Sequence, residues 1–290
     1  MALTVSQAFD VLLERLVPLT SDREAKAKHR ASVEASLKGA TSFNVLRFRE
    51  TGSFTHGTGI RGHCDVDLLA SIGGVRPVSS DTALGWVKST LSSTFWNTTV
   101  VIRRPTVVVL FNGGTETWEI LPAFRTSPLS ETPVYDIPGA ASGWLSSAPT
   151  AHLDYVNEVN QQAGIAGAAK KLARLAKAWK YYNNVPISSF YLEMRAAQYM
   201  AKETWFNPAI DLCRYLEWLH STELADMNDP KGKGGRFSAC SSTATRATAL
   251  SKLSTAATRA RKALNAQEAG SQSNAFEWWN LLFNERFPSR

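Results

Sequence analysis

Residues 51–69 read T-G-S-F-T-H-G-T-G-I-R-G-H-C-D-V-D-L-L, a glycine-rich turn followed by two aspartates one residue apart. Side chains alternate between the two faces of a β-strand, so Asp65 and Asp67 are expected on one face, with Val66 and Leu68 in a core. Two carboxylates on one face repel each other unless a cation lies between them, and hard oxygen ligands favour Mg²⁺ or Mn²⁺. The aspartate pair by itself is equally compatible with a hairpin that has an acidic outer face.

The spacing within this stretch is more specific than the aspartate pair. Gly52-Ser53 is followed by eleven residues and then by the alternating pattern D-V-D-L. This arrangement resembles the signature of the DNA-polymerase-β-like nucleotidyltransferase superfamily. The resemblance implies that Gly52 and Ser53 hold nucleotide phosphates and that Asp65 and Asp67 hold two metal ions.

The chain has 290 residues, enough for one large or two intimately packed domains with a sizeable core. No apolar run approaches the roughly 18 residues of a membrane span, and the N-terminus lacks the pattern of a signal peptide. Cys64, Cys213 and Cys240 form neither a disulfide framework nor a C-x-x-C zinc pair. We therefore expect a cytoplasmic protein without membrane contacts.

The net charge of +7 suits polyphosphate or nucleic-acid ligands, but many basic proteins bind neither. Direct binding of nucleic acid is therefore left open. No Walker-type G-x-x-x-x-G-K-[ST] motif is present, which argues against a P-loop kinase or ATPase.

Hydrophobic periodicity divides the chain into two halves. The first half, residues 1–125, combines two N-terminal helices, the second starting at a Ser21-Asp22 cap, with several strands and one crossover helix, which predicts an α/β or α+β domain. The family resemblance implies that this domain is the catalytic lobe of an α+β fold. Residues 126–150 are rich in Pro, Ser and Gly and are predicted to be a connection without elements of its own. Residues 151–290 are predicted to be a helical lobe, interrupted by a long polar loop at 225–242 and closed by a docked C-terminal helix.

A third carboxylate is expected on a neighbouring strand, because a site for two metal ions normally uses three. Glu119, in T-W-E-I-L-P-A-F, is the best candidate, since Trp118 and Ile120 on either side of it are apolar. A lone acidic residue in a strand more often faces solvent. The order of the motifs favours the catalytic interpretation, although most members of the superfamily carry aspartate here.

Two further segments, K-A-W at 177–179 and S-F-Y-L-E at 189–193, resemble the helical half of oligoadenylate synthetases, cyclic GMP-AMP synthases and the bacterial CD-NTases. The resemblance implies that Lys177 reaches the triphosphate, that Ser189 contacts the nucleotide and that Phe190 stacks on a base. The alternatives are an amphipathic helix with a solvated basic face at Lys177 and a core position for Phe190. Asp229, in N-D-P-K-G, resembles a D-P-x-G element near the nucleotide pocket, and an ordinary turn explains it as well.

The order of these motifs implies a two-lobed polymerase-β-like fold and a nucleotidyltransferase of the CD-NTase family. Such an enzyme uses nucleoside triphosphates and two Mg²⁺ ions, with Mn²⁺ as the alternative, releases pyrophosphate and makes cyclic di- or trinucleotide second messengers in bacterial anti-phage (CBASS) defence. Its downstream effector binds the product rather than the enzyme. The alternatives are a linear oligoadenylate synthetase or template-independent RNA nucleotidyltransferase, and an inactive nucleotide- or RNA-binding module. The complete carboxylate set argues against the inactive module.

Overall fold

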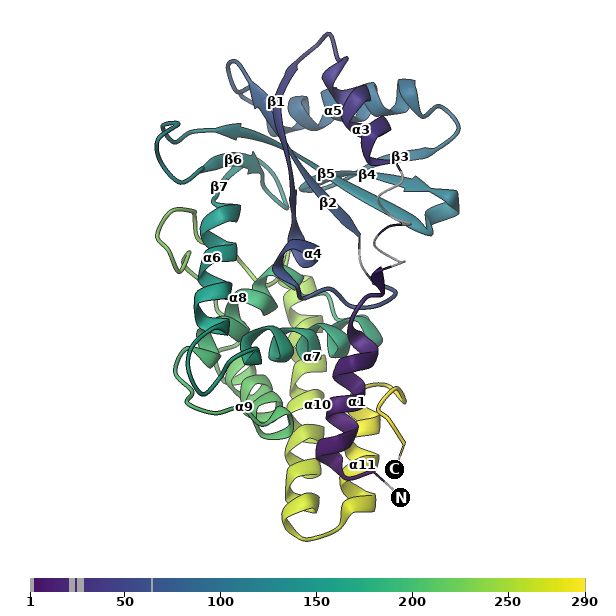
Figure 1. Ribbon diagram of the computed structural model, residues 1–290, viewed down its shortest axis with the longest axis vertical. Helices are drawn as coiled ribbons and strands as arrows, with labels where there is room; N and C mark the ends of the chain where they lie inside the picture. Colours follow the sequence, from purple (N-terminus) through teal and green to yellow (C-terminus); the bar gives the residue numbers. More distant parts are fainter. Residues whose placement is uncertain (1–2, 21–23, 25–28, 64, 290) are drawn as a thin grey trace.

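The computed structural model describes residues 3–20, 24, 29–63 and 65–289. In this part of the chain, the strands gather in one lobe and most helices in the other (Figure 1). Seven strands form one mixed sheet with the central order β1-β2-β5-β4-β3. The strands are β1 (Asn44–Thr51), β2 (Val66–Gly73), β3 (Thr99–Arg103), β4 (Thr106–Phe111), β5 (Glu116–Arg125), β6 (Tyr135–Pro138) and β7 (Trp144–Ser147).

The two faces of the sheet have different neighbours. Apolar side chains of β2, β4 and β5 pack against α3 (Arg30–Lys38) and α5 (Ser80–Thr94), and Trp118 and Ile120 are fully buried there. Both helices lie over the outer side of the sheet (Figure 1). Because side chains alternate along a strand, the opposite face carries Asp67 and Glu119.

The second lobe consists of helices packed around one large core. Its helices are α6 (Pro149–Asn160), α7 (Ala168–Tyr182), α8 (Ser189–Met200), α9 (Pro208–Ser221), α10 (Thr243–Glu268) and α11 (Gln272–Leu282). The predicted docking of the C-terminal helix is confirmed, since Trp279 and Phe283 are fully buried. None of the described helices is both long and apolar enough to cross a membrane.

The N-terminal helix differs from its predicted position in the catalytic lobe. Helix α1 (Val5–Leu16) packs in the helical lobe, where Phe9 lies edge-on to Trp279 at a centroid distance of 4.9 Å. The apolar face of α1 predicts burial but does not say against which partner, and α7, α9 and α11 supply the surface that covers it. The predicted helix start at Ser21-Asp22 lies outside the described residues, as does Cys64.

Residues 126–150 also differ from the predicted connection, because they contribute β6 and β7 to the sheet. Strand β4 pairs with β5 only as far as Ile120, so the end of β5 has a free edge. There Phe124 and Arg125 pair with β6, and β7 completes a hairpin with β6. The sheet therefore continues almost to the start of α6 at Pro149.

Candidate active site

The sheet brings the predicted carboxylates together. Strands β2 and β5 are parallel, and their register places Asp67 directly opposite Glu119. Asp65 immediately precedes β2 and is close enough to raise the pKa of both other carboxyl groups. Asp67 and Glu119, on neighbouring strands, and Asp65, just before β2, thus lie near one another on the face of the sheet opposite α3 and α5.

The surrounding protein raises the pKa of two of these carboxyl groups, those of Asp67 and Glu119. Burial raises the pKa of Asp67 well above its ordinary value, and the negative charges of Glu119 and Asp65 raise it further. Burial and Asp65 also raise the pKa of Glu119, against a smaller opposite effect of the Thr106 hydroxyl. Carboxylates that repel one another in a buried place are donors suited to a hard divalent cation. Among the described residues, no group of three or more acidic, His or Cys side chains is arranged in this structure so that it could hold a metal ion.

Gly52 allows the close approach of the Asp67 carboxylate to the turn. It begins the short helix α4 (Gly52–His56) with φ at +68°, a left-handed backbone conformation that favours glycine. A Cβ atom at this position would lie 1.9 Å from Asp67 Oδ2. No residue with a side chain fits here unless the carboxylate moves.

The segment that follows Gly52 is fixed to the helical lobe by buried polar contacts. Glu193 on α8 accepts hydrogen bonds from Thr58 Oγ1 at 2.6 Å and from Lys177 Nζ on α7 at 2.6 Å. His56 Nδ1 lies 3.0 Å from its other carboxylate oxygen. We call these four residues the interlobe cluster. The pKa of Glu193 is lowered, although burial alone would raise it, because the charge of Lys177 and the hydrogen bond with His56 outweigh the burial.

The structure gives Lys177 an environment that the sequence did not indicate. Its side chain is 1 % exposed and forms a buried ion pair with Glu193, so the solvated basic face considered as an alternative is wrong at this position. Contact between Lys177 and a triphosphate stays a prediction.

Ser189 lies at the first residue of α8, next to the end of α7. Its hydroxyl accepts a hydrogen bond from Lys180 Nζ at 2.6 Å and lies 3.2 Å from the Tyr181 hydroxyl. The Tyr181 ring stacks on His63, which ends the glycine-rich turn, with centroids 4.5 Å apart. The end of α7, the start of α8 and the turn before Asp65 therefore meet at one place.

Phe190 is partly buried among other rings. Its centroid lies 4.8 Å from that of Phe237 and 5.0 Å from that of His152, both in tilted arrangements. The ring is half-buried, so it is neither a fully buried core residue nor a free surface residue. Stacking of Phe190 on a base stays a prediction.

Asp229 organises the polar loop in which it lies. Its carboxylate accepts backbone hydrogen bonds from Lys231 at 3.1 Å, from Lys233 at 2.8 Å and from Gly234. One carboxylate oxygen also lies 3.3 Å from His152 Nε2, beside Phe190. The contacts that the structure shows for Asp229 are those of a turn, in a loop that reaches the neighbourhood of Phe190.

Comparison with known proteins identifies the family. Residues 3–160, more than half of the chain, match the Second Messenger Oligonucleotide or Dinucleotide Synthetase domain. The chain belongs to this family. The synthetase domain extends from α1 through the sheet to the end of α6, and it includes Asp65, Asp67 and Glu119. No curated protein matches the chain.

Solved structures support the same fold for this synthetase. Escherichia coli MS115-1 CdnC with ATP aligns with a TM-score of 0.76 at 18% identity, over 98% of this chain and 99% of that one. Bradyrhizobium diazoefficiens CdnG, a CD-NTase in complex with GTP, aligns with a TM-score of 0.72 at 18% identity, over 97% and 95%. Apo Vibrio cholerae DncV aligns with a TM-score of 0.65 at 16% identity, over 97% and 81%. The predicted CD-NTase family, two-lobed α+β fold and nucleotidyltransferase class are confirmed.

The synthetase contains two residues near the site that the sequence reasoning did not select, Lys180 and Glu193. Both occur in segments adjoining or inside the motifs, since Lys180 follows K-A-W and Glu193 ends S-F-Y-L-E. The spacing of Lys177 and Lys180, three residues apart on a helix, indicates that they share a face. The partner of each lysine depends on the packing of α8 and is not visible in the spacing.

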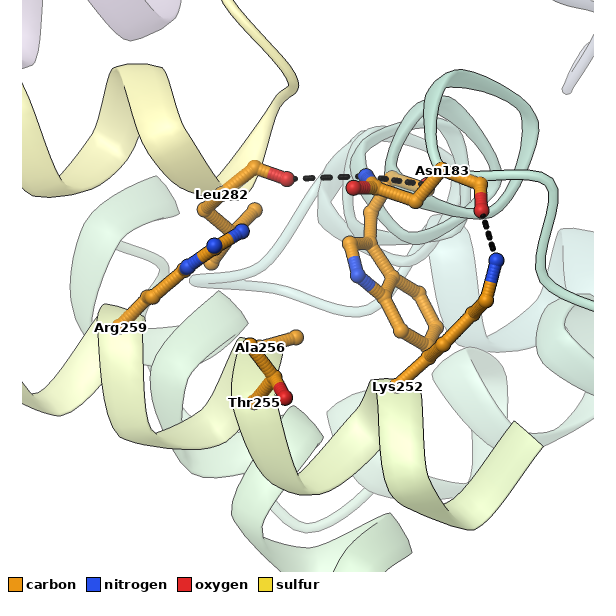
Figure 2. Close-up of a pocket in the computed structure, with 7 residues that line it drawn as sticks. Asn183, Lys252, Thr255, Ala256, Arg259 and Leu282 are labelled. Carbon is orange, nitrogen blue, oxygen red and sulfur yellow. Dashed lines mark hydrogen bonds between the residues drawn. The ribbon is translucent and has the colours of Figure 1, made fainter. Parts of the chain in front are cut away.

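A pocket of the synthetase lies away from the carboxylates, between the ends of α7 and α11 and one face of α10 (Figure 2). Its lining residues are Trp179, Asn183, Lys252, Thr255, Ala256, Arg259 and Leu282. Lys252 Nζ donates to the carbonyl oxygen of Asn183 at 2.6 Å, and Arg259 donates to that of Leu281 at 2.7 Å. The side chains of Lys252 and Arg259 thus bind carbonyl groups at the ends of two helices. We therefore assign the pocket to helix packing rather than to catalysis.

Proposed function

We propose that this nucleotidyltransferase makes cyclic di- or trinucleotide second messengers from nucleoside triphosphates and releases pyrophosphate. The convergence of Asp65, Asp67 and Glu119 beside the Gly52-Ser53 turn carries this proposal. Asp67 lies opposite Glu119, and the pKa values of both carboxyl groups are raised, as expected for a site that holds metal ions and phosphates. An inactive binding module has no need to keep three carboxylates together against their mutual repulsion.

Asp65, Asp67 and Glu119 would hold two Mg²⁺ ions, or Mn²⁺ in their place. Bound metal would neutralise charge on the triphosphate and lower the pKa of the attacking ribose hydroxyl. The attack forms a bond from the ribose oxygen to the α-phosphorus, breaks the bond to the β-phosphate oxygen and releases pyrophosphate and the hydroxyl proton. The protein contributes mainly position and electrostatic stabilisation to such a transfer.

The other assignments follow the family resemblance. Gly52 and Ser53 would hold phosphates through backbone N–H groups and the serine hydroxyl. Ser189 would contact the nucleotide, and Phe190 would stack on a base. Asp229 would shape the loop beside Phe190, and Lys177 remains a candidate for the triphosphate.

Known structures of this fold support nucleotide substrates. CdnC is described with ATP, CdnG with GTP, and DncV, a cyclic AMP-GMP synthase, with the linear intermediate 5′ pppA(3′,5′)pG. We place this synthetase in the cytoplasm, in bacterial anti-phage (CBASS) defence, with an effector that responds to its product. CdnC has also been described in a complex with HORMA, which supports a protein partner as a further possibility for this chain.

Incubation of the purified protein with all four ribonucleoside triphosphates and Mg²⁺ or Mn²⁺ tests the proposal. The products are treated with phosphatase and identified by mass spectrometry. We expect a phosphatase-resistant product with the mass of a closed ring, and none from the Asp65→Asn/Asp67→Asn variant. A phosphatase-sensitive ladder would establish a linear synthetase instead, and full activity of the double variant would refute the assignment of the carboxylates.

A further inference from the structure

Arg103 is an exposed cation at one edge of the sheet that carries the carboxylates. It is the last residue of β3, which ends the strand order β1-β2-β5-β4-β3. Val100, three residues earlier in the same strand, packs in the core on the side of α3 and α5. Because side chains alternate along a strand, Arg103 lies on the opposite face, which also carries Asp67 and Glu119.

The pairing of β3, β4 and β5 brings Arg103 close to Glu119. Arg103 pairs with Thr106 across the turn between β3 and β4. The Thr106 hydroxyl in turn lies 3.5 Å from Glu119 Oε2 on the next strand. Burial and Asp65 raise the pKa of Glu119, and the charge of Arg103 is among the effects that lower it. Arg103 is therefore a neighbour of the carboxylates, although it lies outside every motif that the sequence indicated.

The guanidinium group of Arg103 is available to a ligand. Among the residues that the structure describes, none forms a hydrogen bond or a salt bridge with this side chain. The next residue, Arg104, is engaged instead, since it donates to the Gly139 carbonyl oxygen and to Asp81 Oδ1, each at 2.8 Å. Arg104 thus holds the turn in place, and Arg103 projects from it without an anionic partner at hydrogen-bond distance.

The order of the strands places Arg103 and the turn at Gly52 on opposite sides of the carboxylates. Thr51, the residue before Gly52, pairs with Asp67, and Asp67 pairs with Glu119. Strand β4 follows on the far side of β5, and β3 follows β4, so β1 and β3 lie at opposite edges of this part of the sheet (Figure 1). A line across the sheet therefore passes the turn first, then the carboxylates and finally Arg103.

The geometry of phosphoryl transfer gives these two sides different roles. The attacking and the leaving oxygen lie roughly in line on opposite sides of the phosphorus. The proposed function places the donor triphosphate at Gly52 and Ser53, so pyrophosphate leaves on that side. The hydroxyl of the second nucleotide, the acceptor, then approaches from the side of β4 and β3. An acceptor nucleoside triphosphate carries its own 5′-phosphates, and arginine binds phosphate through paired hydrogen bonds.

We propose that Arg103 binds the 5′-phosphates of the acceptor nucleotide, so that the enzyme prefers an acceptor triphosphate to an unphosphorylated nucleoside. This inference rests on the proposed function, because it takes the side of the donor from there. It assigns a substrate-binding role to a residue of the sheet lobe, at the edge away from the turn.

A single transfer between two blocked nucleotides separates the acceptor from the donor. The donor is a 2′,3′-dideoxynucleoside triphosphate, which has no ribose hydroxyl with which to attack. The acceptor is either a nucleoside triphosphate analogue with a methylene group between its α- and β-phosphates, which cannot release pyrophosphate, or the corresponding nucleoside. Both carry bases that the wild type incorporates. Pyrophosphate release in Mg²⁺ gives kcat and a separate KM for each nucleotide.

We expect Arg103→Gln to raise the KM of the acceptor analogue about 10- to 100-fold, as for the loss of hydrogen bonds to a charged group. The KM values of the donor and of the nucleoside acceptor should stay within about threefold of the wild type. Arg103→Lys should restore part of the effect, because it keeps the charge without the paired donors. Arg47→Gln is the matched control, since Arg47 is an exposed arginine of β1 that pairs with Ser71, four residues beyond Asp67.

Three results would overturn the assignment and leave the proposed function intact. They are an unchanged acceptor KM in Arg103→Gln, a raised donor KM in that variant, and an equal loss with the triphosphate and the nucleoside acceptor. A wild-type protein that transfers no nucleotide, blocked or unblocked, would refute the proposed function as well. The side chain of Arg103 is exposed, so we expect the Tm of Arg103→Gln to equal that of the wild type.

Discussion

The Gly52→Ala variant tests the close packing of the turn at Gly52 against Asp67. The new Cβ would lie 1.9 Å from Asp67 Oδ2 and 2.4 Å from its Cγ. Real Cβ atoms keep at least 3.0 Å, so the carboxylate or the turn must move by about 1.1 Å. The φ of +68° adds a cost of about 1–2 kcal/mol for a residue with a Cβ, and the overpacking adds about 1–3 kcal/mol.

The expected result is a free energy of unfolding lower by about 2–5 kcal/mol, together with a large loss of activity. A displacement of about 1 Å at a reacting centre costs on the order of 100-fold in rate. Urea unfolding gives the stability, and pyrophosphate release at saturating triphosphate gives kcat.

Gly62→Ala is the matched control, because Gly62 shares the left-handed backbone conformation of Gly52 but makes no close contact with Asp67. Its φ is +80°, and an added Cβ meets nothing within 4 Å. We expect a loss of about 1–2 kcal/mol, which lowers Tm by about 2–4 °C per kcal/mol, and unchanged activity. If Gly52→Ala proves as active and as stable as Gly62→Ala, the proposed role of the Gly52–Asp67 contact is refuted.

Three further predictions concern pH, metal and packing. Burial lowers the pKa of Lys180 to about 8. If its charge contributes to binding, the affinity for an ATP analogue with a methylene group between the α- and β-phosphates should be full below pH 8 and fall as the pH rises through this value, and Lys180→Arg should flatten the profile. A wild-type affinity that stays constant up to about pH 10 would contradict this prediction. Mg²⁺ at about 100 times its dissociation constant should stabilise the wild type by about 2.7 kcal/mol and should hardly stabilise the Asp65→Asn/Asp67→Asn variant. The measurement is the difference in Tm between protein in Mg²⁺ and protein in EDTA. Equal Tm differences for the two proteins would refute the assignment of Asp65 and Asp67 as metal ligands. Trp279→Ala should lower the free energy of unfolding by about 3–5 kcal/mol in urea, because the ring is fully buried against Phe9, and a loss under about 1 kcal/mol would disprove that packing.

Much of the site was predictable because its pattern is local. The alternation of Asp65 and Asp67 with apolar neighbours predicts which side chains share a face of one strand. Glu119 follows the same reasoning, and the structure places it opposite Asp67. The helices of the second lobe follow from apolar spacing in the same way.

Partners that lie far apart in the sequence were not predictable by this reasoning. The N-terminal helix has a clear apolar face, but the surface that covers it comes from α7, α9 and α11. Strands β6 and β7 form because the end of β5 offers a free edge, in a segment whose composition indicates only a loop.

The sequence by itself determined the fold class and the family, and it selected Asp65, Asp67 and Glu119 as candidate metal ligands, because each inference depends on residue types at short spacings along one strand or helix. Only the tertiary structure decided that Lys177 is buried in an ion pair with Glu193 while Lys180 donates to the Ser189 hydroxyl. The two lysines look alike in the sequence. They differ because Glu193 reaches Lys177 and also reaches His56 and Thr58, which lie 137 and 135 residues earlier in the chain. Contacts over such separations are set by the packing of whole elements, and no local periodicity encodes them.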